Sequence, residues 1–109
     1  MADNKNTSLF ILPVDALVVG KITSEGNARI EGRLEGEIEV QGDLTLGASA
    51  EVRGDVKSRN ASIGGSVFGS VMVENLLEIT TTGKLHGDIV TKDLRIEAGA
   101  DFIGNSEHW

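Results

Sequence analysis

Apolar residues alternate with polar residues over much of the chain. Ile30, Leu34 and Ile38 lie on one side of an extended segment, with glycine at the intervening positions on that side. The other side carries charged residues, namely Glu31, Arg33, Glu35, Glu37 and Glu39. Side chains of a β-strand point alternately to opposite faces, whereas a helix would need apolar residues three and four positions apart. The pattern therefore predicts short β-strands with one buried and one exposed face.

A short motif recurs along the chain and reads apolar, any residue, glycine, any residue, apolar. Five copies are clear and a sixth is degraded, and they begin at Val18, Leu34, Val52, Val67, Leu85 and Phe102. The glycines of successive copies are 16, 18, 15, 18 and 17 residues apart. A longer self-match, at an offset of 33 residues without a gap, places Leu44 and Leu46 on Leu77 and Ile79. Such internal similarity is typical of a repeat architecture.

The repeat predicts an all-β fold, a single parallel β-helix of about six turns with a triangular cross-section. The strands are too short and too close together for helical crossovers, so each turn is expected to pair with the next. A β-sandwich with glycine-rich turns is the alternative, but a sandwich would not produce the gapless self-match. We expect a flexible N-terminal arm with a short apolar segment over residues 1–13, the β-helix domain over 14–106, and a short C-terminal tail over 107–109.

Composition excludes several classes of function. The net charge is −7 and no cluster of Lys or Arg occurs, which argues against nucleic acid as a partner. The absence of cysteine excludes disulfides, thiolate zinc sites and cysteine nucleophiles. No run of 18 apolar residues is present, and the first residues do not have the pattern of a signal peptide. The cytoplasm is therefore the expected location.

Few residues suggest catalysis or ligand binding. The carboxylates fall on outward positions of the expected strands, where a solvated charged face is the ordinary interpretation. His86 is the one histidine within the repeats, and His108 in the tail is too isolated to share a metal site with it. Gly32 and Gly36 do not precede an expected helix, so they do not form a phosphate-binding loop. We expect no enzyme activity, no cofactor and no metal.

Three stretches of the chain resemble the bactofilin family in their order and spacing. They are residues 30–38 (IEGRLEGEI), the Gly-Asp-Val/Ile triplets that start at Gly54 and Gly87, and residues 96–104 (IEAGADFIG). The resemblance covers residues 14–106. It implies a right-handed, triangular β-helix that polymerises end to end, without nucleotide, into non-polar filaments.

The resemblance also implies a place in the cell and a set of partners. Bactofilin filaments are a bacterial cytoskeleton, peripheral on the inner face of the cytoplasmic membrane, that supports cell shape or localises cell-wall enzymes. The expected partners are therefore other copies of the chain, membrane lipid, and peptidoglycan-modifying enzymes or their membrane adaptors.

The two ends of a β-helix also favour self-association, independently of the family resemblance. Each end exposes unpaired backbone groups and the core, and a soluble monomer needs caps there. No capping helix is evident, and the last turn carries Phe102 and Ile103, whereas the first carries Val18 and Ile22. We predict that these four residues form the polymer contacts. The alternative for Phe102 is that it only fills the core of the last turn.

The apolar segment near the N-terminus does not fit the alternating pattern. Leu9, Phe10, Ile11 and Leu12 are consecutive and bulky, and Pro13 follows them. We predict that they bind the membrane, because an anchor that is marginal for one subunit becomes strong in a filament with many copies. The alternative is that the segment covers the open first turn or pairs there as a strand.

Two other functional classes can be compared with the structural polymer. A β-helical acyltransferase of the hexapeptide-repeat kind needs a strict six-residue period and a supported catalytic histidine, whereas the turns here vary in length and His86 has no visible supporting residues. An ice-binding β-helix needs threonine ladders, and residues 80–82 are a single run. A non-polymerising adaptor is a further alternative. The pattern favours the structural polymer.

Overall fold

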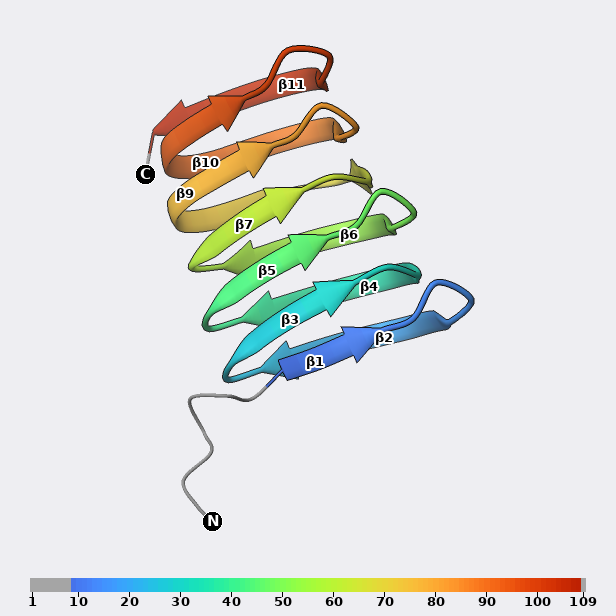
Figure 1. Ribbon diagram of the computed structural model, residues 1–109. Helices are drawn as coiled ribbons and strands as arrows, with labels where there is room; N and C mark the ends of the chain where they lie inside the picture. The colour runs from blue at the N-terminus through green and yellow to red at the C-terminus, as the bar shows by residue number, and fades with distance from the viewer. Residues whose placement is uncertain (1–8, 109) are drawn as a thin grey trace.

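The structure, a computed structural model, describes residues 9–108 and consists of β-strands with no helix in that part of the chain. All the strands belong to one sheet that winds around itself (Figure 1). The eleven strands are β1 (Leu9–Leu12), β2 (Leu17–Ser24), β3 (Asn27–Ile30), β4 (Arg33–Val40), β5 (Asp43–Leu46), β6 (Glu51–Ser58), β7 (Asn60–Ile63), β8 (Ser66–Phe68), β9 (Val71–Ile79), β10 (Lys84–Ile96) and β11 (Asp101–His108).

Each turn of the chain contributes to three faces, and every pairing between turns is parallel. The first face holds β1, β3, β5, β7 and the last parts of β9 and β10. The second face holds the first halves of β2, β4 and β6, then β8 and the starts of β10 and β11. The third face holds the second halves of β2, β4 and β6, the first part of β9, the middle of β10 and the end of β11. In Figure 1 the chain crosses the near side from left to right, returns behind and rises, so the winding is right-handed. The predicted β-helix of about six turns is confirmed.

The glycine of the recurring motif forms the corner between the second and third faces. These glycines have φ between 132° and 148°, a region that other residues rarely adopt, and they are Gly20, Gly36, Gly54, Gly69, Gly87 and Gly104. They stack in one column, and a Cβ atom on Gly54 would overlap the carbonyl oxygen of Gly36. The motif therefore recurs because each turn needs a residue without a side chain at this corner.

A ladder of side-chain amides and carboxylates stabilises the corner between the third and first faces. The backbone N–H of Asp43 donates to Oδ1 of Asn27 at 2.9 Å, and Nδ2 of Asn60 donates to Oδ1 of Asp43 at 2.9 Å. These bonds connect three successive turns. Asn and Asp suit such a corner because their short side chains can hydrogen-bond to nearby backbone groups.

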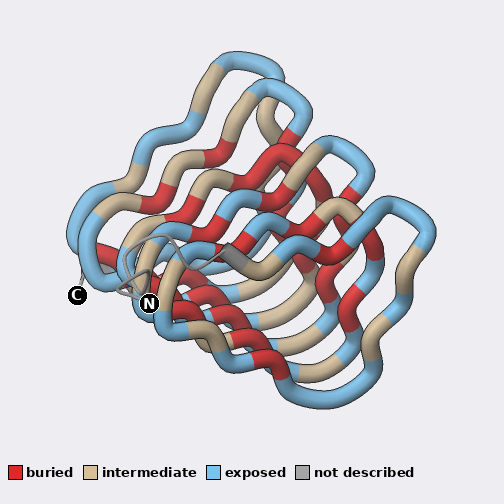
Figure 2. Tube along the Cα trace, turned by 60° about the horizontal axis from the view of Figure 1, so that its bottom comes forward, coloured by how far each residue is buried: buried red, intermediate tan, exposed pale blue. Residues whose placement is uncertain are grey.

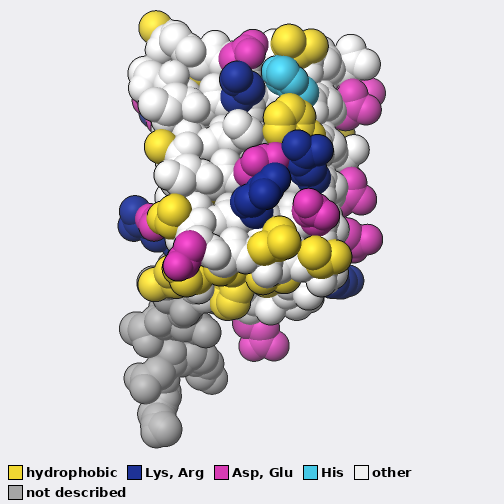
Figure 3. Space-filling model, turned by 90° about the vertical axis from the view of Figure 1, so that its right-hand side faces the viewer, with side chains coloured by type: hydrophobic (Ala, Val, Ile, Leu, Met, Phe, Trp, Pro, Cys, Tyr) yellow, Lys and Arg dark blue, Asp and Glu magenta, His cyan; other side chains and the backbone are white. Residues whose placement is uncertain are grey.

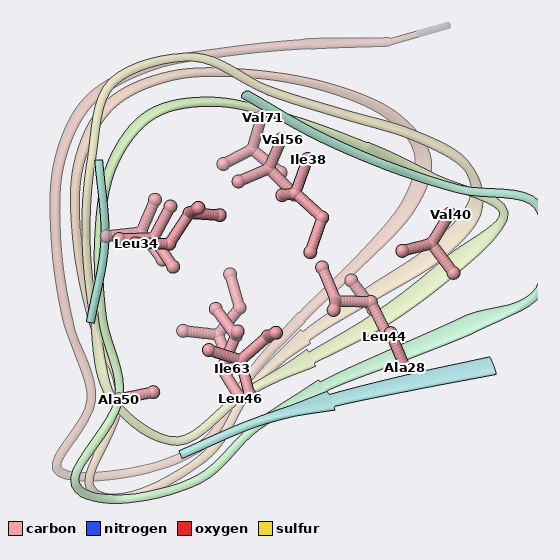
Figure 4. Packing of buried hydrophobic residues seen from close by; sticks show 14 of the residues in the cluster. Ala28, Leu34, Ile38, Val40, Leu44, Leu46, Ala50, Val56, Ile63 and Val71 are labelled. Carbon is pink, nitrogen blue, oxygen red and sulfur yellow. The ribbon is translucent and has the colours of Figure 1, made fainter. Parts of the chain in front are cut away.

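The core is a narrow column of aliphatic side chains that point inward from all three faces. Figure 4 shows them converging within a roughly triangular outline. On the second face, the inward positions of the four middle turns are completely buried, namely Leu34, Val52, Val67 and Leu85. Buried and exposed residues alternate along the strands of the middle turns (Figure 2), such as β4 and β6 on either side of their corner glycines, as the sequence pattern predicts.

Both boundaries of the predicted β-helix domain differ from the structure. The solenoid already includes β1, so its first described residue is Leu9 rather than residue 14, because the segment pairs in register with β3. Strand β11 extends to His108, which pairs with Thr91, so residues 107 and 108 are not a separate tail. Residues 1–8 of the predicted arm, and Trp109, lie outside the described residues.

Candidate polymer interfaces at the two ends of the solenoid

The N-terminal end presents the apolar side of the first turn. Its inward residues are Phe10, Leu12, Ala16, Val18 and Ile22. Each has a core neighbour from the second turn on one side only, as Val18 does over Leu34. Leu34 is completely buried, whereas Val18 is only partly buried. The missing neighbour leaves an apolar surface at this end.

The C-terminal end has the same character. Leu94, Ile96, Ala100 and Phe102 point inward from the last turn. Ile96 lies in register with Ile79, yet Ile79 is fully buried and Ile96 is 44% exposed. The column of core residues on the third face ends in a polar residue, Ser106. The C-terminal end is therefore apolar on two faces and polar on the third.

The backbone at both ends is also open. In the part of the chain that the structure describes, β1 pairs only with β3, β2 only with β4, and β11 only with β10. A strand with one unpaired edge offers a row of N–H and C=O groups to another strand. Within residues 9–108 no helix covers either edge. Each end can therefore bind a further turn through both backbone hydrogen bonds and apolar contact.

The structure brings three of the four predicted contact residues to these ends. Val18, Ile22 and Phe102 point inward in the two terminal turns, as the prediction of a polymer contact requires. Ile103 instead points outward, in register with His86, and is 59% exposed. Ile103 therefore lies on the side of the rod and not at the centre of the C-terminal end surface.

Sequence reasoning missed Leu94 and Ile96, which are half of the C-terminal end surface. Their signal was available, because they lie 17 residues after Leu77 and Ile79, which the self-match had already aligned. They share the first face with those residues and continue two core columns to the end of the rod.

The segment predicted to bind membrane is a strand of the solenoid. Leu9, Phe10, Ile11 and Leu12 pair with Asn27–Ile30, which is the alternative that the sequence left open. Phe10 packs against the core and Leu12 is 4% exposed, because alternate residues of a strand face inward. Ile11 points outward and is 54% exposed. The side chains of Phe10, Ile11 and Leu12 therefore cannot enter a membrane together while β1 stays in place.

His86 and the nearby Asp101 are the polar residues of the repeats that lie closest to a catalytic type of pair. His86 packs edge-on against Phe68 with ring centroids 5.5 Å apart, and its Nε2 lies 3.5 Å from Oδ2 of Asp101. Within the described residues, no group of three or more His, Cys, Asp or Glu side chains could hold a metal ion. A search of the same residues finds no helix long and apolar enough to span a bilayer.

The fold defines a class of protein, the parallel β-solenoid, whose two terminal turns carry no capping helix within residues 9–108. Comparison with known proteins gives the family. The family model described as "Bactofilin: Polymer-forming cytoskeletal" matches residues 10–107. The chain belongs to the bactofilin family, and the resemblance noted in the sequence is confirmed.

Two curated relatives come from Myxococcus xanthus. Bactofilin BacP is 28% identical over 104 residues, which cover 95% of this chain and 43% of the relative. Bactofilin BacO is 29% identical over 89 residues, which cover 82% of this chain and 71% of the relative. This chain therefore spans less than half the length of BacP and most of the length of BacO.

A solved structure of a Thermus thermophilus bactofilin, described as a cryo-EM reconstruction of double helical filaments, is also similar. The TM-score is 0.87 at 30% sequence identity, and the match covers 92% of this chain and 99% of that chain. The relative that shares this fold is thus a protein seen as a filament.

Proposed function

We propose that this chain is a bacterial cytoskeletal protein that polymerises end to end, without nucleotide, into non-polar filaments. We further propose that the filaments lie at the inner face of the cytoplasmic membrane, where they support cell shape or localise cell-wall enzymes. The observation that carries the proposal is the pair of uncapped apolar ends, with Val18 partly exposed at one end and Phe102 at the other.

The energy of an end contact supports polymerisation. Complete burial of a large apolar side chain contributes about 1.5–3 kcal/mol. The end residues gain only part of this, since Leu12 is already only 4% exposed in the subunit, whereas Ile96 is 44% exposed. The apolar contact therefore offsets part of the cost of association, roughly 4–15 kcal/mol. Backbone hydrogen bonds between the open strand edges strengthen the contact. No energy from nucleotide hydrolysis is needed for such a contact to form.

The test is electron microscopy and pelleting of the purified chain in buffer without nucleotide. Filaments should form spontaneously, and added ATP or GTP should change neither their amount nor their critical concentration. Discrete monomers or trimers under these conditions would overturn the proposal. Filaments that appear only with nucleotide would overturn its nucleotide-independent part alone.

The Thermus relative suggests that more than one contact is involved. Its filaments are described as double helical, and by analogy we expect two threads in each filament of this chain. Two threads need a contact along the side of the rod in addition to the contacts at its ends.

Membrane attachment stays a prediction, and the position of β1 decides how it must be tested. Deleting residues 1–12 would remove a strand of the solenoid and disturb the N-terminal end. Removing residues 1–8, alone or with the uncharged substitution Ile11→Asn, keeps Phe10 and Leu12 in the core. We expect both variants to form filaments that co-sediment less with anionic liposomes than the parent does. Equal co-sedimentation would rule out this end of the chain as the anchor.

A further inference from the structure

One outward column on the second face, which we call the stripe, runs along the whole rod. Register places its six members in successive turns: Val19, Glu35, Arg53, Phe68, His86 and Ile103. Val19 is 72% exposed and Ile103 is 59% exposed, so both ends of the stripe are apolar. Figure 3 shows this side of the molecule, with hydrophobic side chains near both ends and charged side chains between them.

The residues of the stripe, taken from turn one to turn six, are complementary to the same residues taken from turn six to turn one. If a second copy lies face to face and antiparallel, turn one meets turn six, turn two meets turn five, and turn three meets turn four. Val19 then meets Ile103, Glu35 meets His86, and Arg53 meets Phe68. These are an apolar pair, a carboxylate with an imidazole, and a guanidinium with an aromatic ring, which are three favourable pairings.

The same cation–π pairing already exists within one copy. The guanidinium carbon of Arg53 lies 5.4 Å from the ring centroid of Phe68, and Phe68 in turn packs against His86. The stripe is therefore ordered by its own contacts before a second copy arrives, which lowers the entropy cost of docking.

Other registers and orientations match less well. A shift by one turn in one direction brings Arg53 against His86, and a shift in the other direction brings Glu35 against Phe68. Parallel pairing about a two-fold axis along the rod places each residue of the stripe against its own copy, so Glu35 meets Glu35. Like charges that face each other directly are destabilising. The chemistry of the stripe thus selects one register and one direction.

The neighbouring column on the second face is less complementary, since Leu17 would meet Asp101 of the other copy. In the same arrangement Arg33 would meet Lys84 of the other copy, which is a like-charge pair. Each has an opposite charge within its own copy, because Arg33 lies 3.5 Å from Glu51 and Lys84 is in register with Asp101. These exposed side chains are long and can turn toward those partners.

The other two faces are poorer surfaces for self-pairing. On the third face the corresponding antiparallel arrangement brings Glu37 against Asp88, and this face carries five carboxylates but only two lysines, Lys21 and Lys57. On the first face Arg29 would meet Glu78 favourably, but Ile11 would meet Arg95. Only the stripe has apolar residues at both of its ends and complementary groups between them.

We propose that two copies of this chain pair side by side and antiparallel through the stripe on the second face. The partner is a second copy of the same chain. The step from paired subunits to paired threads rests on the proposed end-to-end polymerisation, whereas the pairing itself does not, since it uses none of the core residues at the ends.

Crosslinking can test the register directly, because the chain has no cysteine of its own. The single variants Glu35→Cys and His86→Cys are mixed and treated with a thiol crosslinker of about 10 Å, the usual distance between packed sheets. Both residues lie one turn or more from the ends, so an end-to-end junction leaves like positions roughly 15 Å apart, given about 4.8 Å per turn. The matched control is the pair Glu37→Cys and Asp88→Cys, in the same turns but on the third face.

We expect at least ten times more 35–86 heterodimer than 37–88 heterodimer, as measured by mass spectrometry. Dominant 35–35 and 86–86 products would show parallel pairing and overturn the proposal, as would a 35–86 yield no higher than the control. The experiment is done with assembled protein and again with Phe102→Arg at high concentration. If the parent chain does not pellet, the proposed filament is wrong. The 35–86 product reports on side-by-side pairing whether or not filaments form.

Charge reversal supplies a second readout. Glu35→Arg should convert paired threads into single threads by electron microscopy while pelleting is retained. His86→Glu should do the same, and the double variant should restore pairs because the introduced guanidinium and the introduced carboxylate would then face each other. Glu37→Arg, which makes the same change of charge two residues away on the third face, should leave pairs intact. Paired threads in Glu35→Arg would overturn the proposal.

Discussion

Phe102 lies directly above Leu85 in the parallel register of β10 and β11, yet Leu85 is completely buried and Phe102 is only partly buried. Both point into the same core column. The difference arises because Leu85 is covered by a turn on each side, whereas no further turn follows Phe102 in the described chain. We therefore predict that another copy binds against the part of Phe102 that the subunit leaves exposed.

Phe102→Arg should abolish filaments without unfolding the subunit. Complete burial of a phenylalanine side chain contributes roughly 1.5–3 kcal/mol, and Phe102 still has part of this to gain at the contact, so losing it should raise the critical concentration by about three- to tenfold. The unpaired guanidinium would add a desolvation cost at the contact. Pelleting should therefore be lost while the β-type circular dichroism spectrum remains. Asn105→Arg, on an outward and exposed position of the same strand, is the control and should still form filaments.

The product that Phe102→Arg leaves behind should reveal the polarity of the filament. In a non-polar filament like ends meet, so blocking the C-terminal end should leave dimers joined at their N-terminal ends. Val18→Arg should leave dimers joined at their C-terminal ends, and the double variant should be monomeric. All three variants are made in the Glu35→Arg background, so that the proposed side-by-side pairing does not contribute. In a polar filament each single variant would be monomeric, and mixing the two would produce one heterodimer. Sedimentation velocity distinguishes these outcomes, and monomers from both single variants would contradict a non-polar filament.

The middle of the fold could be predicted from the sequence because repetition makes it visible. The glycine of each motif marks a corner, and the apolar residues on either side of it mark the inward positions of two faces. Leu34 and Ile38, around Gly36, are an example. Six copies of one motif thus give the number of turns and the direction of the core.

The ends were harder to predict because the pattern weakens there. Four consecutive apolar residues hide the alternation of β1, and only pairing with β3 shows that Phe10 and Leu12 face inward and Ile11 outward. At the other end, Ser106 takes an inward column position that earlier turns fill with apolar residues. A terminal turn has only one neighbour, so its sequence is constrained less strongly than that of a middle turn.

Substitution of the corner glycines with alanine should lower the free energy of unfolding by different amounts. The amount depends on whether an atom of the preceding turn lies where the new Cβ atom would be. Gly54 and Gly20 have nearly the same φ, 137° and 132°, but only Gly54 has the carbonyl oxygen of Gly36 where a Cβ atom would be. The backbone strain of a non-glycine residue costs about 1–3 kcal/mol at either position. Gly20→Ala should therefore lower the free energy of unfolding by that amount, and Gly54→Ala should lower it by about 3 kcal/mol or more because backbone must also move.

Urea unfolding in a background that carries both Val18→Arg and Phe102→Arg measures these two values without a contribution from end-to-end association. Equal losses of stability in the two alanine variants would show that conformational strain alone makes glycine necessary at the corner. A larger loss in Gly54→Ala would show that close stacking of the turns is the stronger constraint.

Ser58 and Thr91 occupy the same core column on the third face, but their hydroxyl groups have different surroundings. Ser58 is 4% exposed, lies in register with Val73, and its Oγ has no hydrogen-bond partner in the described part of the chain. Thr91 Oγ1 donates to the carbonyl oxygens of Asn75 at 3.2 Å and Asp93 at 3.0 Å. An unsatisfied buried hydroxyl costs about 1–3 kcal/mol, whereas a hydrogen-bonded one contributes about 1 kcal/mol.

Substitution with valine should therefore have opposite effects at these two positions. Ser58→Val should raise the free energy of unfolding by about 1 kcal/mol, because it removes the unsatisfied hydroxyl and adds buried apolar surface. Thr91→Val should lower it by about 1 kcal/mol, because two carbonyl groups lose their shared donor. Ser58→Ala separates the effect of the hydroxyl from that of added volume, which can strain a packed core. Urea unfolding checks all three variants, and a loss of stability in both Ser58 variants would mean that the hydroxyl is hydrogen-bonded after all.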